Sequence, residues 1–244
     1  MQYGEFAFVY DSLMSDVDRD GWADYAAGFI PKGTSVLECA CGTGEMSLRL
    51  ARRGYSVRAC DVSDGMLLVA ANKQREQGLA KADLKFFRTD MRSLPTDKKY
   101  GCVAAFCDGV NYLVSREDAK KFFSSAHDAL TDGGILVFDV SSRYKLEKVL
   151  GNNTFAYDGR DIAYMWQNAY DPGSKLIEMR LSFFKREGGH YDRFDETHIQ
   201  RAHSERELTS WLRETGFEPE AYSFMTLEAP KETDERIQFF ARKI

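Results

Sequence analysis

The sequence predicts an α/β fold in which helices cover both faces of a mostly parallel sheet, with a small antiparallel sheet inserted late in the chain. Three observations predict it. Residues 35–61 follow the strand, turn, helix, strand order of a βαβ unit. Acidic residues recur at the ends of successive predicted strands, and residues 141–203 change to the alternating pattern of antiparallel strands.

Length and composition are those of a large soluble domain. The 244 residues, 43% of them hydrophobic, can form one large α/β domain or a domain with a sizeable insertion. The net charge of -5 and the absence of a dense Lys/Arg block argue against nucleic acid as partner without excluding a local basic patch. No apolar run approaches the ~18 residues of a membrane span, and the N-terminus lacks a signal-peptide pattern. We therefore expect a cytoplasmic protein without membrane association.

The five cysteines are expected to be reduced and buried. They lie on or beside predicted strands, and no second cysteine pair or nearby histidine completes a tetrahedral metal site. The sequence therefore predicts no bound metal. The cysteines are Cys39, Cys41, Cys60, Cys102 and Cys107.

The predicted βαβ unit points to a nucleoside-containing ligand. Its first strand ends in the small-residue turn CGTG, a helix follows, and the second strand, 56–60, ends in Asp61. Glycines in such a turn let a ligand approach the backbone. A carboxylate 17 residues after Gly44 can accept two hydrogen bonds from a ribose diol.

The spacing of the turn separates two kinds of cofactor. Dinucleotide folds need a third glycine, in the pattern G-x-G-x-x-G, where this chain has Ser47, and Glu45 at the helix start is a poor host for pyrophosphate. The pattern Glu38-x-Ala40-x-Gly42-x-Gly44 instead resembles motif I of the class I S-adenosylmethionine (SAM) methyltransferases, which usually have glycine in place of Ala40. The resemblance implies a Rossmann-like sheet of seven strands, SAM as methyl donor and S-adenosylhomocysteine (SAH) as product.

The resemblance also implies which residues contact the cofactor. A helix capped by Ser63 carries Met66 near the adenine, and Asp90 with the backbone of Met91 reads the adenine edge after strand 84–87. Two alternatives stay open, a core role for Met66 and a turn cap for Asp90. The implied cofactor residues are Tyr10, Glu38, Ala40, Gly42, Gly44, Asp61, Val62, Met66, Asp90, Met91 and Cys107.

The first 30 residues are predicted to form two short helices with an aromatic face. They resemble the lid of several small-molecule methyltransferases, in which case Tyr10 or Tyr3 would lie near the sulfonium, whose charge an aromatic face attracts. The alternative is that these aromatic residues only cap the core.

The loop after strand 101–106 resembles the acceptor-side motif IV. Its polar residues Asp108, Asn111 and Tyr112 are the groups best placed to orient a substrate. A helix from Ser115 and a Gly-Gly turn then lead into strand 135–140, where Asp139 is a weaker site candidate.

Residues 141–203 are expected to form a separate antiparallel sheet over the ligand crevice. Strands are predicted at 160–170, 175–186 and 190–203. They carry His190, His198 and His203, and a histidine on an exposed strand is more often solvated than bound to substrate. After a helix capped by Ser204, segments 218–225 and 236–244 read as a closing hairpin.

These features predict a SAM-binding domain (1–140 and 204–244, with 1–30 as helical lid) and an antiparallel substrate lid (141–203). The expected function is methyl transfer from SAM to an amine or hydroxyl of a small molecule, by a monomer or homodimer. Because an in-line displacement needs positioning rather than a triad, only Asp108, Tyr112 and His198 are catalytic candidates. The alternatives are a tRNA or other macromolecule methyltransferase, an NAD-dependent oxidoreductase and a non-catalytic SAM-binding protein.

Overall fold

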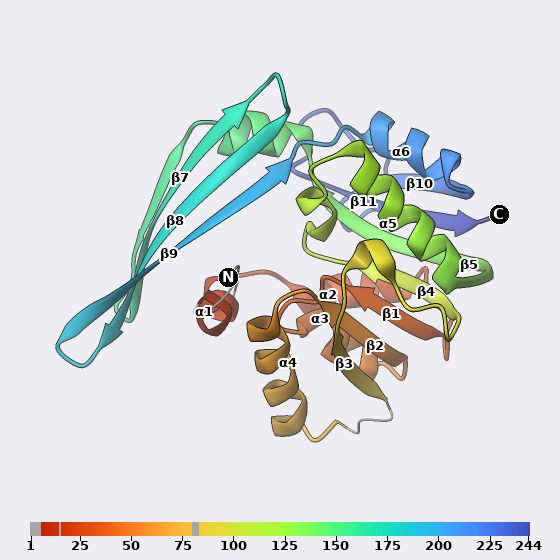
Figure 1. Cartoon of the computed structure of the whole chain (residues 1–244), viewed down its shortest axis with the longest axis horizontal. Helices are drawn as coiled ribbons and strands as arrows, with labels where there is room; N and C mark the ends of the chain where they lie inside the picture. The colour runs from red at the N-terminus through yellow and green to blue at the C-terminus, as the bar shows by residue number, and fades with distance from the viewer. Residues whose placement is uncertain (1–5, 15, 80–82) are drawn as a thin grey trace.

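The computed structural model describes residues 6–14, 16–79 and 83–244, and they form two separate sheets (Figure 1). The larger has seven strands in the order β10-β11-β5-β4-β1-β2-β3, and the smaller has four in the order β6-β7-β8-β9. In Figure 1 the smaller sheet reaches away from the body of the molecule. The predicted fold class, a seven-stranded α/β sheet with an antiparallel insertion, is confirmed.

The large sheet is parallel except at one edge. The five strands that lie side by side in the order β3, β2, β1, β4 and β5 pair in parallel. The strand β11 pairs antiparallel with both β5 and β10. The closing hairpin is therefore as expected. The strands are β1 (Ser35–Cys39), β2 (Ser56–Asp61), β3 (Leu84–Arg88), β4 (Tyr100–Ala105), β5 (Leu130–Ser141), β10 (Phe217–Ser223) and β11 (Arg236–Lys243).

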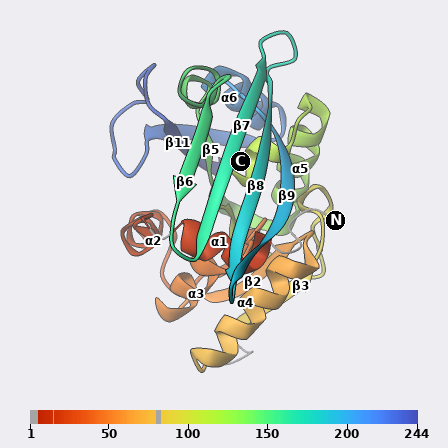
Figure 2. The same cartoon turned by 90° about the vertical axis from the view of Figure 1, so that its left-hand side faces the viewer.

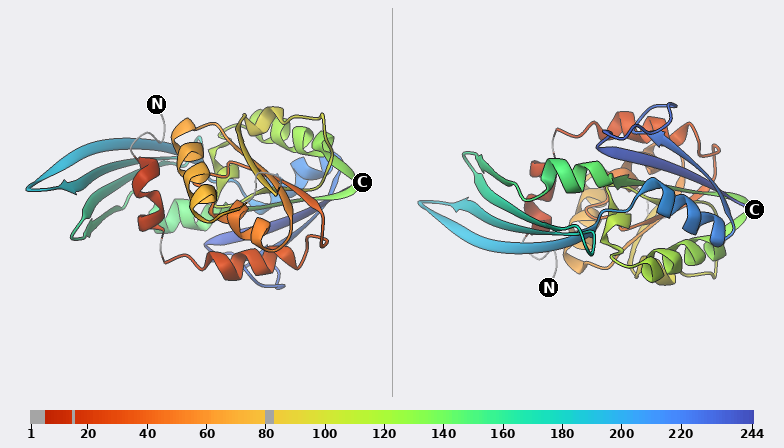
Figure 3. Two further views of the ribbon diagram at one scale, coloured as in Figure 1. Left: turned by 90° about the horizontal axis from the view of Figure 1, so that it is seen from below. Right: turned by 90° about the horizontal axis from the view of Figure 1, so that it is seen from above.

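Helices cover both faces of the large sheet (Figure 3). On one face α2 and α3 bury Trp22 and Leu50, and on the other α5 and α6 bury Phe122 and Leu212. Serine side chains cap α4, α5 and α6 at Ser63, Ser115 and Ser204, as predicted. The helices are α2 (Arg19–Ala27), α3 (Glu45–Arg52), α4 (Asp64–Glu76), α5 (Arg116–Ala129) and α6 (Glu205–Glu214). None of the helices in the described ranges has the length and apolar character needed to cross a membrane.

The small sheet has one strand more than predicted. Three of its strands match the predicted segments, and the additional strand β6 is a largely exposed edge of only five residues, which gives a weak strand pattern. The π-helical segment η3 (Lys145–Leu150), which precedes β6, was not predicted either. Figure 2 shows the four strands face on. They are β6 (Thr154–Asp158), β7 (Ile162–Asp171), β8 (Leu176–Glu187) and β9 (His190–Arg201).

The first helix, α1 (Phe6–Leu13), joins the two sheets. The ring of Phe6 packs 5.2 Å from that of Phe183 in β8, and Met66 of α4 belongs to the same apolar cluster. The N-terminal region thus contains two short helices, as predicted, with α1 between the small sheet and α4 (Figures 1 and 2). Tyr3 lies outside the described residues.

Candidate active site

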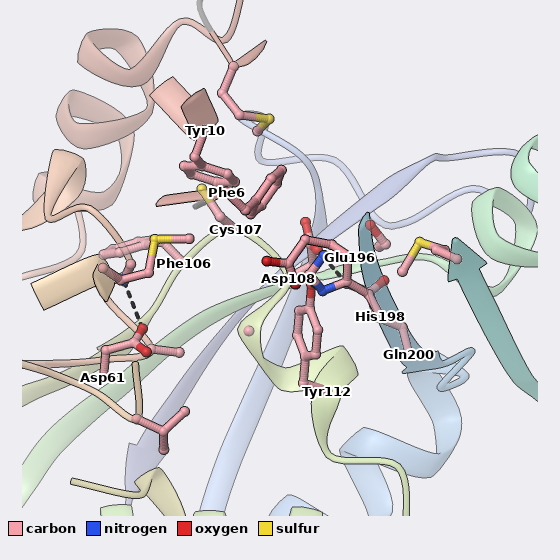
Figure 4. A pocket seen from close by; sticks show the side chains of 18 of the residues that line it. Phe6, Tyr10, Asp61, Phe106, Cys107, Asp108, Tyr112, Glu196, His198 and Gln200 are labelled. Carbon is pink, nitrogen blue, oxygen red and sulfur yellow. Dashed lines mark hydrogen bonds between the residues drawn. The ribbon is translucent and has the colours of Figure 1, made fainter. Parts of the chain in front are cut away.

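A cavity of about 1020 Å³ lies among the carboxyl ends of the large sheet's strands, α1 and the small sheet. Its volume is at the upper end of the range for small-molecule sites, ~300–1,000 Å³. Figure 4 shows Asp61 on one side of it and Asp108, Tyr112, His198 and Gln200 together on the other. Of the cofactor and catalytic residues expected from the sequence, these line it: Tyr10, Glu38, Ala40, Gly42, Asp61, Val62, Met66, Asp90, Met91, Cys107, Asp108, Tyr112 and His198.

The turn between β1 and α3 holds the carboxylate at the end of β2. The backbone N–H of Gly42 donates to Oδ2 of Asp61 at 2.9 Å, and that of Ser63 donates to Oδ1 at 2.9 Å. Asp61 is 8% exposed, and burial raises its pKa. A Cβ on Gly42 would have no heavy atom within 4 Å. The turn therefore leaves open space above an oriented acceptor of hydrogen bonds, which fits a ribose diol.

Gly44 does not line the cavity. Its φ of +76° is left-handed, and a Cβ there would lie 2.7 Å from Cζ of Phe86 in β3. The close packing of the turn on the sheet thus explains this glycine. Ala40, where the family usually has glycine, adopts a φ of 49°, so the departure from the motif leaves the left-handed turn in place.

Glu38 is an acid that the site keeps protonated at neutral pH. It is 2% exposed and accepts a hydrogen bond from the hydroxyl of Ser47. Burial raises its pKa to about 8. The carboxyl of Glu38 can therefore donate one hydrogen bond and accept others without placing a charge beside the ligand.

Asp90 caps a turn, which is the alternative that the sequence left open. Its carboxylate accepts from the backbone N–H of Arg92 at 2.8 Å and from Nη2 of that arginine at 2.6 Å. The hydrogen bonds from Arg92 lower the pKa of Asp90. Asp90 and Met91, at the start of η1 (Met91–Ser93), still line the cavity. Their contact with adenine stays a prediction.

Asp108 is held by the protein on both carboxylate oxygens. Oδ1 pairs with Nη2 of Arg236 at 2.8 Å, and Oδ2 accepts from Nε2 of Gln200 at 2.9 Å. Its backbone N–H donates to Oδ2 of the buried Asp139, which also pairs with Arg236. Burial raises the pKa of Asp139 to about 6. Asp139 is therefore a structural partner of Arg236, and Asp108 links the loop to β9 and β11.

The loop itself is in an uncommon backbone conformation. Cys107 and Asp108 have φ values of 57° and 53°, in the left-handed region that non-glycine residues seldom adopt. The short helix η2 (Gly109–Tyr112) follows directly. Arg236 and Asp139 hold Asp108 in this conformation, so the pairing between distant strands sets the shape of the cavity floor.

Tyr112 and His198 meet across the two sheets. The hydroxyl of Tyr112 lies 3.4 Å from Nδ1 of His198, and the ring of Phe6 lies 5.5 Å from the imidazole ring. His198 is 4% exposed, and burial lowers its pKa to about 4. At neutral pH this histidine is therefore uncharged.

Three polar residues considered from the sequence have other roles. Asn111 is fully buried; its amide donates to the backbone carbonyls of Ser141 and Arg201 at 3.0 Å each and accepts from the N–H of Ser141. It fixes the chain and does not orient a substrate. His203 is buried against the carbonyl of Leu113, and His190 is exposed beside Asp192. Neither lines the cavity: His190 shares the His198 face of β9 but lies at the exposed far end of the strand, and His203 lies beyond β9.

Arg19 is a cavity residue that the sequence did not indicate. Its side chain is 9% exposed, and within the described ranges its Nη2 has no hydrogen-bond acceptor and the guanidinium has no ion pair. A single arginine in a polar segment has no local signature. Arg236 and Gln200 were missed for the same reason, because their partner Asp108 is 128 and 92 residues away in the sequence.

Known proteins resemble the chain over its full length. A family model described as "Methyltransferase domain" matches residues 36–134. The "Putative methyltransferase" of Geobacillus sp. (strain WCH70) is 34% identical over all of both chains, and "Putative methyltransferase YqeM" of Bacillus subtilis (strain 168) is 36% identical over all of this chain and 98% of its own.

A solved structure agrees with these relatives. A SAM-dependent methyltransferase from Clostridium acetobutylicum ATCC 824 superposes with a TM-score of 0.89 at 32% identity, covering 99% of this chain and 98% of that one. The strand order, the glycine turn and these relatives agree: the chain belongs to the class I SAM-dependent methyltransferases.

Proposed function

We propose that this methyltransferase transfers the methyl group of SAM to an amine or hydroxyl of a small-molecule acceptor. One observation carries the proposal. The same cavity runs from the Gly42 turn and Asp61 to the Tyr112–His198 pair beneath the small sheet, so a cofactor and an acceptor fit side by side in it.

The cofactor side offers groups that complement the ribose, the adenine, the carboxylate and the sulfonium of SAM. Asp61 accepts from the ribose hydroxyls, and Met66 with the Asp90–Met91 turn flanks the adenine. The unmatched guanidinium of Arg19 binds the carboxylate of the methionine part. Tyr10, whose pKa burial raises, presents a neutral aromatic ring to the sulfonium. SAM supplies an electrophilic methyl group.

The acceptor side positions the nucleophile and takes one proton. An amine or hydroxyl has to lose a proton as it is methylated, and uncharged His198 is placed to accept it, with the hydroxyl of Tyr112 orienting the acceptor. Asp108 is less suited to act as base because Arg236 and Gln200 occupy both of its oxygens. It holds β9, and with it His198, over the cavity. The small sheet excludes water from the reaction.

The structure favours a small acceptor over a macromolecule. The small sheet and α1 form one wall of the cavity, and the chain carries a net charge of -5. Both features suit a small molecule better than an RNA backbone. The open cavity also argues against a non-catalytic SAM-binding protein, whose acceptor space would be closed.

Transfer of labelled methyl groups tests this proposal. The protein is incubated with methyl-labelled SAM and, separately, with a low-molecular-weight metabolite extract, total RNA and a protein fraction. We expect label in small molecules, in bonds stable enough to identify as N- or O-methyl, and less label with His198→Ala. Label confined to RNA or protein would contradict the small-molecule assignment.

A further inference from the structure

Four cationic side chains among the described residues line the cavity, and two of them form no ion pair with another described residue. Arg92 pairs with Asp90 and Asp118, and Arg236 pairs with Asp108 and Asp139. In the part of the chain that the structure describes, neither of the other two forms an ion pair. They are Arg19 and Lys145.

SAM can form an ion pair with only one of these two cations, because it has a single carboxylate. Under the proposed function Arg19 binds that carboxylate. Lys145 belongs to a different element, η3, whose Leu146 and Leu150 pack with Met179 at the base of the small sheet. A positive charge is therefore left on the acceptor side of the cavity.

The carboxylate of the helix that carries Lys145 is already paired with other cations. The only carboxylate of that helix, Glu147, pairs with Arg143 at 3.0 Å and with Lys148 at 2.9 Å. The cavity wall from η3 to the small sheet is formed by Leu150, Trp166 and Met179, all without charge. An ammonium group in such a wall favours an anionic ligand, and the apolar side chains can pack against the rest of it.

We propose that Lys145 binds an anionic group, a carboxylate or a phosphate, of the methyl acceptor. The inference rests on the proposed function, because it assigns the second charge after SAM has matched the first. Asn111, next to Tyr112, bonds to the backbone of Ser141, four residues before Lys145. This connection fixes the start of η3 relative to the Tyr112–His198 pair. Lys145 thus selects acceptors whose anionic group lies at a set distance from the methylated atom.

Glu196 supplies the opposite charge to the same cavity. It extends inward from β9, two residues before His198, and is 9% exposed (Figure 4). A cationic acceptor would be drawn to this carboxylate, and an anionic one to Lys145. Probes of both signs therefore decide which charge governs the acceptor.

The test is calorimetric titration of the SAH-saturated protein with four probes of similar size: benzoate, phenyl phosphate, benzyl alcohol and benzylamine. Saturation with SAH keeps Arg19 paired with the carboxylate of SAH, so that Arg19 does not bind the probes. We expect at least one anion to bind more tightly than the neutral and cationic probes. Lys145→Gln should weaken anion binding by about ten-fold or more, the effect of losing one charge-assisted hydrogen bond, while Lys145→Arg retains most of it. Lys148→Gln, which removes an exposed lysine of the same helix, should change nothing.

Three results would overturn the inference: no anion binding by a protein that binds SAH, equal anion binding in Lys145→Gln and Lys148→Gln, or tighter binding of benzylamine than of both anions. Failure to bind SAH would instead contradict the cofactor side of the proposed function. In that case the same anion titrations without SAH, comparing the Gln variants of Lys145 and Arg19, still decide whether Lys145 binds an anion.

Discussion

Single residues at this site are explained by what surrounds them more than by their type. Three acids at strand ends, Glu38, Asp61 and Asp108, are in different states. Glu38 is protonated by burial, Asp61 is oriented by two backbone N–H groups, and Asp108 is paired with Arg236. The sequence placed Glu38 and Asp61, together with Asp90, at one crevice because strand ends of a parallel sheet share an edge, and it placed Asp108 by the resemblance to motif IV. It could not assign their states, which depend on contacts between distant residues.

Arg19 provides a test at this scale. If it binds the carboxylate of the cofactor's methionine part, Arg19→Gln should weaken SAH binding by about ten-fold or more, because a charge-assisted pair is lost. Binding of 5′-methylthioadenosine, which lacks that carboxylate, should stay the same. Calorimetric titration of both ligands measures the difference. An equal loss for both ligands would show that the variant disturbs the whole cavity and would remove the assigned role.

Three glycines, Gly42 and Gly44 in the turn after β1 and Gly54 after α3, separate a ligand role from a packing role. Gly42, Gly44 and Gly54 all have positive φ, but only at Gly44 would a Cβ meet a neighbour, Cζ of Phe86 at 2.7 Å. Alanine at each position should cost about 1–2 kcal/mol of unfolding free energy from backbone strain, and at Gly44 a further ~1–3 kcal/mol from overpacking. Denaturant unfolding measures these costs.

Ligand binding by the same three variants distinguishes the roles further. Gly42→Ala should lose SAH affinity although its fold is only modestly destabilised, because its Cβ would enter the cavity. Gly54→Ala, the control, should bind SAH normally. Unchanged SAH affinity in Gly42→Ala would rule out close contact of the ligand with this turn.

Among the elements, α1 is tied to the glycine turn by a hydrogen bond between side chains far apart in the sequence. Asp11 accepts from the hydroxyl of Thr43 at 2.7 Å and pairs with Lys73 of α4, which also binds Glu45 at 2.6 Å. The sequence predicted a helix here from its aromatic face. It did not predict the contacts of Asp11 with Thr43 and Lys73, since Asp11 and Thr43 are 32 residues apart in the sequence.

Removing the contacts of Asp11 should make α1 less stable without unfolding the large sheet. In Asp11→Ala we expect faster amide hydrogen exchange in residues 6–13, because α1 loses two polar contacts with the body, and faster SAH dissociation in stopped-flow measurements. The exposed Asp16, just after α1, provides a control in Asp16→Ala. Exchange in α1 that matches the wild type would show that its apolar contacts alone hold it.

Elsewhere the elements followed their local patterns closely. The strand and helix segments of the large sheet were predicted to within a few residues, except that β5 starts at Leu130 rather than 135, where its pairing with β4 shifts register between Tyr100 and Cys102. The exposed edge strand β6 and the π-helical η3 were missed. Both are short, with five and six residues, so each shows only one repeat of an apolar period.

For the whole molecule, the joint between the two sheets is the feature that no local pattern reveals. Gln200 to Asp108, Asn111 to the carbonyl of Arg201, and His198 beside Tyr112 connect β9 to the loop after β4. These pairs span 86 to 92 residues of sequence. The sequence therefore predicted the presence of both sheets and a crevice between them, but not the contacts that hold His198 in place.

Burial of ionisable groups should make the stability of the whole molecule depend on pH. The pKa of Glu38 is raised from 4.5 to about 8, so the folded protein holds more protons than the unfolded chain between these values. Its contribution is complete below pH 4.5 and is lost as the pH rises to 8. Neutral His198, with its pKa lowered from 6.5 to about 4, acts oppositely, and stability is lost as the pH falls through that range.

Glu38→Gln isolates the first of these effects. Glutamine resembles a protonated carboxyl, so the variant should gain unfolding free energy relative to the wild type between pH 6 and 8.5, by up to about 3 kcal/mol. Urea unfolding at several pH values measures the difference. A constant difference across this range would show that Glu38 does not take up a proton on folding.

Binding of the adenosyl cofactor is the central claim, and calorimetric and thermal-shift titration with SAM, SAH and NAD in parallel tests it most directly. A ligand at about a hundred times its dissociation constant stabilises the folded state by ~2.7 kcal/mol, which raises the melting temperature by several degrees. We expect SAM and SAH to bind and stabilise the protein, and NAD to have no effect. Stabilisation by NAD but not by SAM or SAH would contradict the assignment of the Gly42 turn and Asp61 to a SAM site.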